Sequence, residues 1–224
     1  MRKRIKLKDR ILPDYSVAEE VTNMTTHIVG GALGIVALIL CTLFSVRRND
    51  SCILFGSIIY GISMIVLYAM SSIYHGLHPG MAKKVMQVLD HCTIYFLIAG
   101  TYSIIALSAL RPVSPRLGWG MLAFQWILTA IAVTLTAIDL KKYNVFSMIC
   151  YIGMGWAILP FIPQTIAGMS FNGFLLLLSG GISYTIGAVL YGIGSKVHWM
   201  HSVFHIFVVL GSLLQFLSIL LYAI

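Results

Sequence analysis

Histidine is the residue of this 224-residue chain whose placement points most clearly to chemistry, because imidazole nitrogens are common zinc ligands. Each of its seven histidines falls at or near one end of a long apolar segment, and Asp90 falls beside one of them. The histidines are His27, His75, His78, His91, His198, His201 and His205. A simpler alternative exists for single members of the group, since a polar ring at a membrane interface needs no further role.

Two of these histidines have the spacing of a metal-binding pair. His201 and His205 are four residues apart, so a helix would present both imidazoles on one face. His198 shares that face, but about 10.5 Å of helix rise separates it from His205. One metal ion therefore cannot take all three, and a third ligand should come from another segment. His75 ends an apolar segment at the same level, with Ser71 one helical turn before it.

Asp90 and Ser71 are the other candidates for chemistry near these histidines. A carboxylate at the membrane depth expected for Asp90 is costly unless it is paired or linked to a metal. The alternative for Asp90 is a structural carboxylate at a helix N-terminus. Ser71 could orient a water or donate to a developing oxyanion, or it could simply bond its own helix backbone.

The segments that must position these residues are apolar and long enough to cross a bilayer. Hydrophobic residues make up 59% of the chain and charged residues 10%, against about 25% charged in a soluble domain. The apolarity is continuous rather than alternating, which indicates helices and not barrel strands. The sequence predicts an all-α integral membrane protein, a bundle of seven transmembrane helices, in which Pro160 and Pro163 end or bend the fifth. The expected spans are Ile28–Val46, Cys52–Tyr74, Val85–Leu110, Leu117–Ile138, Val145–Ile162, Phe171–Ile193 and Trp199–Ile224.

The distribution of basic residues predicts the orientation, because cytoplasmic segments retain Lys and Arg. A cytoplasmic N-terminus places eleven basic residues inside and four outside, with the C-terminus outside. Those inside would be Arg2, Lys3, Arg4, Lys6, Lys8, Arg10, Lys83, Lys84, Lys141, Lys142 and Lys196; those outside would be Arg47, Arg48, Arg111 and Arg116. Residues 1–27 then form a cytoplasmic basic tail with an amphipathic lead into the first helix, and residues 28–224 form the transmembrane domain.

The formal charge of +8 has two possible explanations. Nucleic-acid binding is disfavoured, because the basic tail has no interleaved aromatic residues and no soluble binding module accompanies it. Attraction to the anionic lipids of the inner leaflet accounts for the charge more simply. The expected partners are therefore membrane lipids, and the expected location is a cell membrane that the chain crosses several times.

The order of these motifs along the chain resembles that of a known family. The segments Ser71–His75 (SSIYH) and His201–His205 (HSVFH), with Asp90 between them, are similar to the Ser-x3-His, Asp, His-x3-His pattern of the hemolysin III family. That family is related to the progestin and adipoQ receptors and, more distantly, to alkaline ceramidases. The segment Glu19–His27 also resembles the family's lead into the first helix, whereas Ser202 stands where bacterial members frequently have an acidic residue.

The resemblance implies a zinc ion held by His75, His201 and His205, with a water in the fourth position and Asp90 beside that water. Three protein ligands and an open position form the composition of a catalytic zinc site. A carboxylate such as Asp90 can accept a proton as water attacks a carbonyl, and Ser71 could assist. The implied substrate is an amide or ester at the inner-leaflet boundary, such as an acylated lipid.

Three classes of function are compatible with these residues and the resemblance. The chain could be a zinc-dependent lipid hydrolase, or a receptor-like regulator of membrane homeostasis whose zinc is structural, or a cytolytic protein as the family name suggests. Lysis has the least physical support, because a pore needs a polar lumen or a strongly amphipathic inserting segment. The first two classes differ in whether the histidine site opens to lipid or is covered by the segment Glu19–His27.

Overall fold

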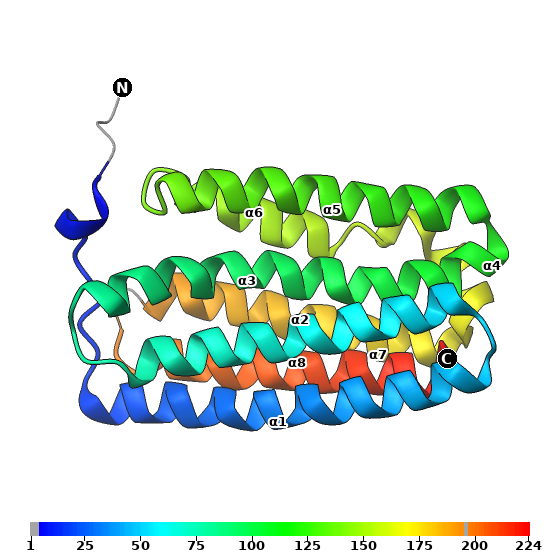
Figure 1. Ribbon diagram of the computed structural model, residues 1–224, viewed down its shortest axis with the longest axis horizontal. Helices are drawn as coiled ribbons and strands as arrows, with labels where there is room; N and C mark the ends of the chain where they lie inside the picture. The colour runs from blue at the N-terminus through cyan, green and yellow to red at the C-terminus, as the bar shows by residue number, and fades with distance from the viewer. Residues whose placement is uncertain (1–4, 195–196) are drawn as a thin grey trace.

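The computed structural model describes residues 5–194 and 197–224, and all regular secondary structure in them is helical (Figure 1). The long helices are α1 (Val17–Arg47), α2 (Ser51–Gly76), α3 (Met81–Ile105), α5 (Pro115–Ile138), α6 (Asn144–Gly155), α7 (Ile162–Gly194) and α8 (Met200–Tyr222). Short elements are η1 (Leu7–Asp9), the π-helical η2 (Ala106–Leu110), α4 (Arg111–Val113) and η3 (Leu159–Phe161). The helices lie side by side along one long axis, as expected for an integral membrane bundle (Figure 1).

Among the described residues, six segments are long and apolar enough to cross a membrane. They are Val17–Arg47, Ser51–Gly76, Met81–Val113, Pro115–Ile138, Asn144–Gly194 and Met200–Tyr222. The fifth of these is 51 residues long and contains both α6 and α7. The two expected spans Val145–Ile162 and Phe171–Ile193 therefore fall within a single apolar segment.

The helix α6 and the part of α7 after Ser170 run in opposite directions along α3. On α6, the hydroxyl of Tyr151 donates to the carbonyl of His91 (2.8 Å), and further along the hydroxyl of Tyr102 donates to the carbonyl of Gly155 (2.8 Å). On α7, Tyr191 lies close to the C-terminal end of the helix and its hydroxyl is 3.1 Å from Nε2 of His91, near the start of α3. The same reversal is visible in Figure 1, where the chain passes from α6 to the far end of the bundle before α7 returns.

The chain is broken after α6 where the prolines predict it, but it reverses direction later, at Ser170 inside α7, where the backbone is not helical (φ 68°). Proline has no N–H to donate, so it cannot continue a helix ladder in the ordinary way. The helix α6 ends at Gly155, Pro160 lies in η3, and Pro163 occupies the first turn of α7. Tyr102 of α3 bridges the break, because its hydroxyl also accepts a hydrogen bond from the backbone N–H of Ile158 (3.1 Å).

The first helix begins earlier than the apolar sequence does. Ser16 and Glu19 form a capping box: Ser16 Oγ accepts from the N–H of Glu19 (3.3 Å), and Glu19 Oε2 accepts from the N–H of Ser16 (2.9 Å). These bonds start α1 at Val17, eleven residues before Ile28, where the expected span begins. The polar segment that precedes the apolar run is thus part of the same helix.

Close packing of α1 against α2 fixes how that polar segment faces the bundle. A Cβ at Gly30 would lie 2.4 Å from the ring of Tyr68, and one at Gly34 would lie 3.1 Å from the side chain of Ile65. Any larger residue at Gly30 would push the two helices apart. The approach brings the preceding turns of α1 against the end of α2.

Residues 5–16 lie across one end of the bundle, called the N-terminal end below, opposite the C-terminus (Figure 1). The N–H of Ile5 donates to Asp139 Oδ2 (3.0 Å) between α5 and α6, and Lys84 Nζ donates to the carbonyl of Lys8 (2.6 Å). Burial opposes ionisation of Asp139, but hydrogen bonds from the N–H groups of Ile5 and Lys142 outweigh it and hold the pKa of that carboxyl below its usual value. Of the basic residues used for orientation, Arg2, Lys3, Arg4 and Lys196 lie outside the described residues.

Candidate metal centre

Three histidines from two helices meet at the N-terminal end of the bundle. His75 lies at the end of α2, and His201 and His205 lie one turn apart at the start of α8. All three side chains are buried, and one ring nitrogen of each lies within 4.8 Å of the others. This group could hold a metal ion, and it contains the same three residues that the sequence resemblance implies.

The geometry of the group fits a zinc ion. At a Zn–N distance of about 2.0–2.1 Å, two nitrogens of a tetrahedral site lie about 3.3 Å apart. The Nε2 atoms of His201 and His205 face each other at 3.1 Å. Nε2 of His75 is buried and has no hydrogen-bond partner among the described residues, a costly condition for a ring nitrogen unless something binds it. Three imidazoles of this kind suit zinc better than a hard cation such as Mg²⁺ or Ca²⁺.

The other ring nitrogen of His75 is held by the first helix. Nδ1 of His75 lies 2.6 Å from Glu20 Oε2, and Glu20 Oε1 accepts from Lys83 Nζ at 2.7 Å. Histidines that bind metals usually donate their second N–H to such an acceptor, which sets the orientation of the ring. The sequence alone indicated Lys83 only as a cytoplasmic charge and assigned no role to Glu20. The one feature that could have pointed to Glu20 is that an acidic residue directly precedes an apolar helix.

Two further residues of α1 surround the centre. The ring of His27 stacks on that of His205, with 3.8 Å between the ring centroids, and meets Tyr68 edge-on. Both ring nitrogens of His27 are buried, and neither has a hydrogen-bond partner in residues 5–194 or 197–224. Asn23 is fully buried, and its Nδ2 is 3.5 Å from Nδ1 of His75. His27 therefore does not have the environment of a histidine that simply places its polar ring at the membrane interface.

The segment before α1 covers the centre from outside. The ring of Tyr15 stacks on His201 at 4.8 Å between centroids. Burial raises the pKa of Tyr15, and nearby Tyr191, Glu20 and Asp90 reinforce the shift, so the phenol stays neutral.

Glu19 ties the same cover to the start of α8. Its Oε1 accepts from the N–H of Trp199 (2.7 Å), a residue with φ of 67°. Nδ1 of His198 lies 3.4 Å from Glu19 Oε2, and His198 is 79% exposed and outside the group of three histidines. The sequence predicted that His198 is not a ligand, but the helix-rise argument does not apply, because α8 begins at Met200 and His198 precedes it.

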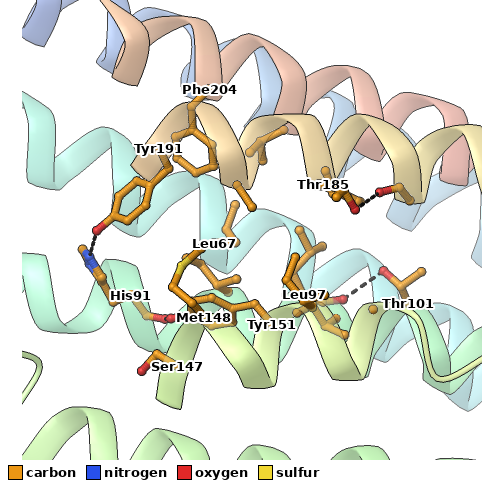
Figure 2. A pocket seen from close by; sticks show the side chains of 18 of the residues that line it. Leu67, His91, Leu97, Thr101, Ser147, Met148, Tyr151, Thr185, Tyr191 and Phe204 are labelled. Carbon is orange, nitrogen blue, oxygen red and sulfur yellow. Dashed lines mark hydrogen bonds between the residues drawn. The ribbon is translucent and has the colours of Figure 1, made fainter. Parts of the chain in front are cut away.

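An apolar cavity of about 180 Å³ adjoins the centre on the inner side. It is bounded mainly by α3, α6, α7 and α8, and His27 and His201 belong to its wall. Figure 2 shows His91 and Tyr191 facing each other at one end of it and Thr101 and Thr185 toward the other. Most of the lining between them is apolar, with Leu97, Met148 and Phe204 as examples. The histidine centre is therefore both covered from outside and continuous with an apolar space inside the bundle.

The two expected catalytic residues have different surroundings. Asp90 lines the cavity together with His201, and its Oδ2 is 3.6 Å from Nδ1 of His91. Ser71 is buried on α2, one turn before His75, and is not part of the cavity wall. Neither residue belongs to the group of three that could hold a metal. His78 lies in the connection between α2 and α3.

A bundle of long apolar helices with a buried group of three histidines defines a multi-pass integral membrane protein with a potential metal centre. Comparison with known families gives the particular assignment. The family described as "Haemolysin-III related" matches residues 15–216, which is most of the chain. The chain belongs to this family.

Individual relatives agree with the assignment over nearly their whole length. The chain is 36% identical to "Hemolysin-3" of Bacillus cereus over 206 residues, covering 92% of each chain. It is 31% identical to "Hemolysin-3 homolog" of Bacillus subtilis (strain 168), covering 94% of this chain and 97% of the relative. It is 26% identical to human "Monocyte to macrophage differentiation factor", covering 90% of this chain and 83% of that protein.

Proposed function

We propose that this chain is a zinc-binding membrane protein that acts on, or responds to, the state of membrane lipids, with hydrolysis of lipid amide or ester bonds as its chemistry. One observation supports this most strongly: His201, a member of a group of three buried histidines, lines an apolar cavity inside a membrane bundle. His75, His201 and His205 would hold the zinc ion, which when bound supplies a Lewis acid and a water of lowered pKa.

The cavity would receive the acyl chain of the lipid. An apolar space with a few polar groups at one end orients an amphiphile, because its tail avoids water while its polar group needs partners. His91 and Tyr191 stand with Asp90 at the end nearest the histidines. A lipid bound tail-inward would therefore present its amide or ester carbonyl beside Asp90 and His201.

Asp90 is the proposed proton acceptor. Its carboxylate would accept the proton from the attacking water and donate it to the departing amine or alcohol. This is general acid–base catalysis, the usual role of a carboxylate in hydrolysis. Ser71 lies off the cavity, so its proposed part is to orient a water beside His75 rather than to touch the lipid.

A regulatory function is the second candidate, and the cover over the centre favours it. Tyr15 stacks on His201, and Glu19 binds the backbone of Trp199. A zinc ion beneath such a cover would tie α1, α2 and α8 together as a structural element. The protein would then respond to lipid without hydrolysing it.

The deciding experiment compares wild-type protein with the Asp90→Asn variant, both zinc-loaded, on ceramide-like and phospholipid substrates. Zinc content by elemental analysis should be about one per chain in both, because Asp90 is outside the ligand group. Release of fatty acid should occur only with the wild type. Equal release from both would remove Asp90 from the chemistry, and no release from either would favour the regulator.

The proposed topology is seven spans with residues 1–27 on the cytoplasmic side and residues 28–224 forming the membrane domain. The opposite directions of α6 and of the part of α7 after Ser170 support the division of the 51-residue segment into two spans. Residues 5–16 and the C-terminus lie at opposite ends of the bundle, which supports an odd number of spans (Figure 1). A reporter at the N-terminus should be active inside the cell and one after Ile224 outside. Reporters active on the same side would contradict the proposal.

A further inference from the structure

Lys83 has an unusual environment for a lysine in the first turn of a helix. Its side chain is 4% exposed, and its ammonium group donates to Glu20 Oε1 (2.7 Å) and to the carbonyl of Leu77 (2.9 Å). The ammonium also lies 5.2 Å from the ring centroid of Tyr74. Burial of a lysine is costly unless its charge is matched, so a surface charge that merely marks membrane orientation would not need this position.

The partner of Lys83 is the residue that contacts His75. Glu20 uses one oxygen for Lys83 and the other for Nδ1 of His75, at 2.6 Å. A carboxylate that accepts hydrogen bonds from both sides needs its negative charge, and the ammonium beside it stabilises that charge. The chain Lys83, Glu20, His75 thus joins α3, α1 and α2.

The competition for Nδ1 of His75 shows what the negative charge achieves. The amide Nδ2 of Asn23 lies 3.5 Å from the same nitrogen and could only donate to it. Donation by Asn23 would put the ring proton on Nε2, and a protonated Nε2 cannot bind a metal. Acceptance by Glu20 puts the proton on Nδ1 and leaves the Nε2 lone pair free. The shorter contact and the charge both favour Glu20.

We infer that Lys83 is a positioning residue: by holding Glu20 as an ionised acceptor, it fixes His75 in the tautomer whose Nε2 faces the metal centre. The buried Nε2 of His75 has no hydrogen-bond partner among the described residues, and this arrangement keeps its lone pair free to bind the metal. The inference rests on the proposed zinc centre and adds two residues to it, neither of which touches the metal.

The test measures zinc affinity of the purified full-length protein by competition with a chelator of known affinity. The variants are Lys83→Met, which removes the charge and keeps the length, Lys83→Arg, which keeps the charge, and Glu20→Gln. Lys84→Met is the matched control, because Lys84 is the next residue and its ammonium binds the carbonyl of Lys8 instead. The visible absorption spectrum of cobalt-loaded protein reports the ligand geometry independently of affinity.

Lys83→Met and Glu20→Gln should each weaken zinc binding about 10- to 100-fold, the usual cost of losing an outer partner of a metal-binding histidine. Both should change the cobalt spectrum. Lys83→Arg should recover most of the affinity, and Lys84→Met should match the wild type. The double variant Glu20→Gln/Lys83→Met should be no weaker than either single variant, since both act through one bond.

A purely structural lysine gives a different pattern. If Lys83 only caps α2 through Leu77, Lys83→Met would lower thermal stability while affinity and cobalt spectrum stayed as in the wild type, and the inference would be overturned. If Lys83→Met does not accumulate, unchanged affinity in Glu20→Gln would overturn it equally. A wild-type protein that bound no zinc would remove the proposed centre together with this inference.

Discussion

The two ends of the bundle each hold an ion pair, and the pairs differ in what surrounds them. At the far end, Asp50 pairs with Arg111, and the two side chains are 32% and 22% exposed. Asp50 also caps α2, accepting from the N–H groups of Cys52 (2.9 Å) and Ile53 (3.4 Å). Both residues have an evident structural role, because the pair starts one helix and ties it to the chain after α3.

At the N-terminal end, the pair of Glu20 and Lys83 lies among buried polar atoms that have no hydrogen-bond partner in the part of the chain that the structure describes. A buried polar atom without a hydrogen bond is uncommon and calls for an explanation. Such atoms gather around the three histidines: Asn23 Oδ1, Nδ1 and Nε2 of His27, Nε2 of His75, Ser202 Oγ and Nδ1 of His205. The difference separates an ion pair that stabilises a helix start from one that lies beside the proposed metal centre. Substitutions at the two ends should therefore have separate effects.

The largest expected effect is the loss of metal from the N-terminal end. His205→Ala should remove most of about one zinc per chain, because a site with three imidazoles loses a third of its protein ligands. Elemental analysis after gel filtration measures it. His198→Ala is the control and should keep its zinc, since His198 is 79% exposed and outside the group. Undiminished zinc in His205→Ala would remove the proposed centre.

The next effect concerns the cavity. Ala188 of α7 belongs to the cavity wall, whereas its neighbour Val189 is 59% exposed on the outer surface of the bundle. Ala188→Trp should fill the space meant for an acyl chain and lower fatty-acid release at least about tenfold while zinc content stays the same. Val189→Trp should leave both unchanged. Equal activity in the two variants would show that the lipid does not enter this cavity.

Much of this arrangement could be predicted from the sequence. Continuous apolar runs predicted the membrane helices, and the four-residue spacing of His201 and His205 predicted the pair that α8 presents. His198 lies outside the group as predicted, but because it precedes α8, which begins at Met200, and not because of helix rise. The third histidine required either the family resemblance or the structure, because spacing along one helix says nothing about which other helix approaches it.

The remaining features depend on contacts between distant residues. Lys83 lies 63 positions from Glu20, so a count of basic residues could only treat it as a charge near a membrane. The cavity arises from four helices packed around a space, and no run of sequence describes it. The start of α1 was placed too late, because hydropathy detects the apolar run and not the polar capping box that precedes it. The catalytic parts of Asp90 and Ser71 remain predictions.

A smaller effect is expected at the far end. Asp50→Ala should lower stability by about 1 kcal/mol through loss of the α2 cap, which corresponds to a few degrees in Tm. Asp50→Asn should lower it less, because asparagine also caps helices and only the ion pair is lost. Thermal unfolding in detergent measures both. Zinc content should equal that of the wild type in each, and a loss of zinc would contradict the separation of the two ends.

The smallest expected effect is the pH dependence of the stability that the pair of Asp50 and Arg111 contributes. The hydrogen bond from Arg111 holds the pKa of Asp50 below its usual value in the folded protein. A carboxyl with a lowered folded pKa stabilises the fold above its unfolded pKa, about 3.9, and loses that contribution as the pH falls through the folded pKa. Because the pair is partly exposed, the contribution should be under about 1 kcal/mol and should shrink in high salt.

Wild type and Asp50→Asn should therefore differ in Tm by a small, constant amount between pH 7 and 5. The difference should begin to shrink as the pH falls below about 4 and should close as the pH falls through the lowered folded pKa of Asp50, where that side chain is also uncharged. Replacing Arg111 with Met should give the same pH profile, because it removes the same pair from the other side. A Tm difference that persisted unchanged at pH 3 would assign the effect of Asp50 to helix capping alone, and the far end would then contribute no ion pair to the comparison.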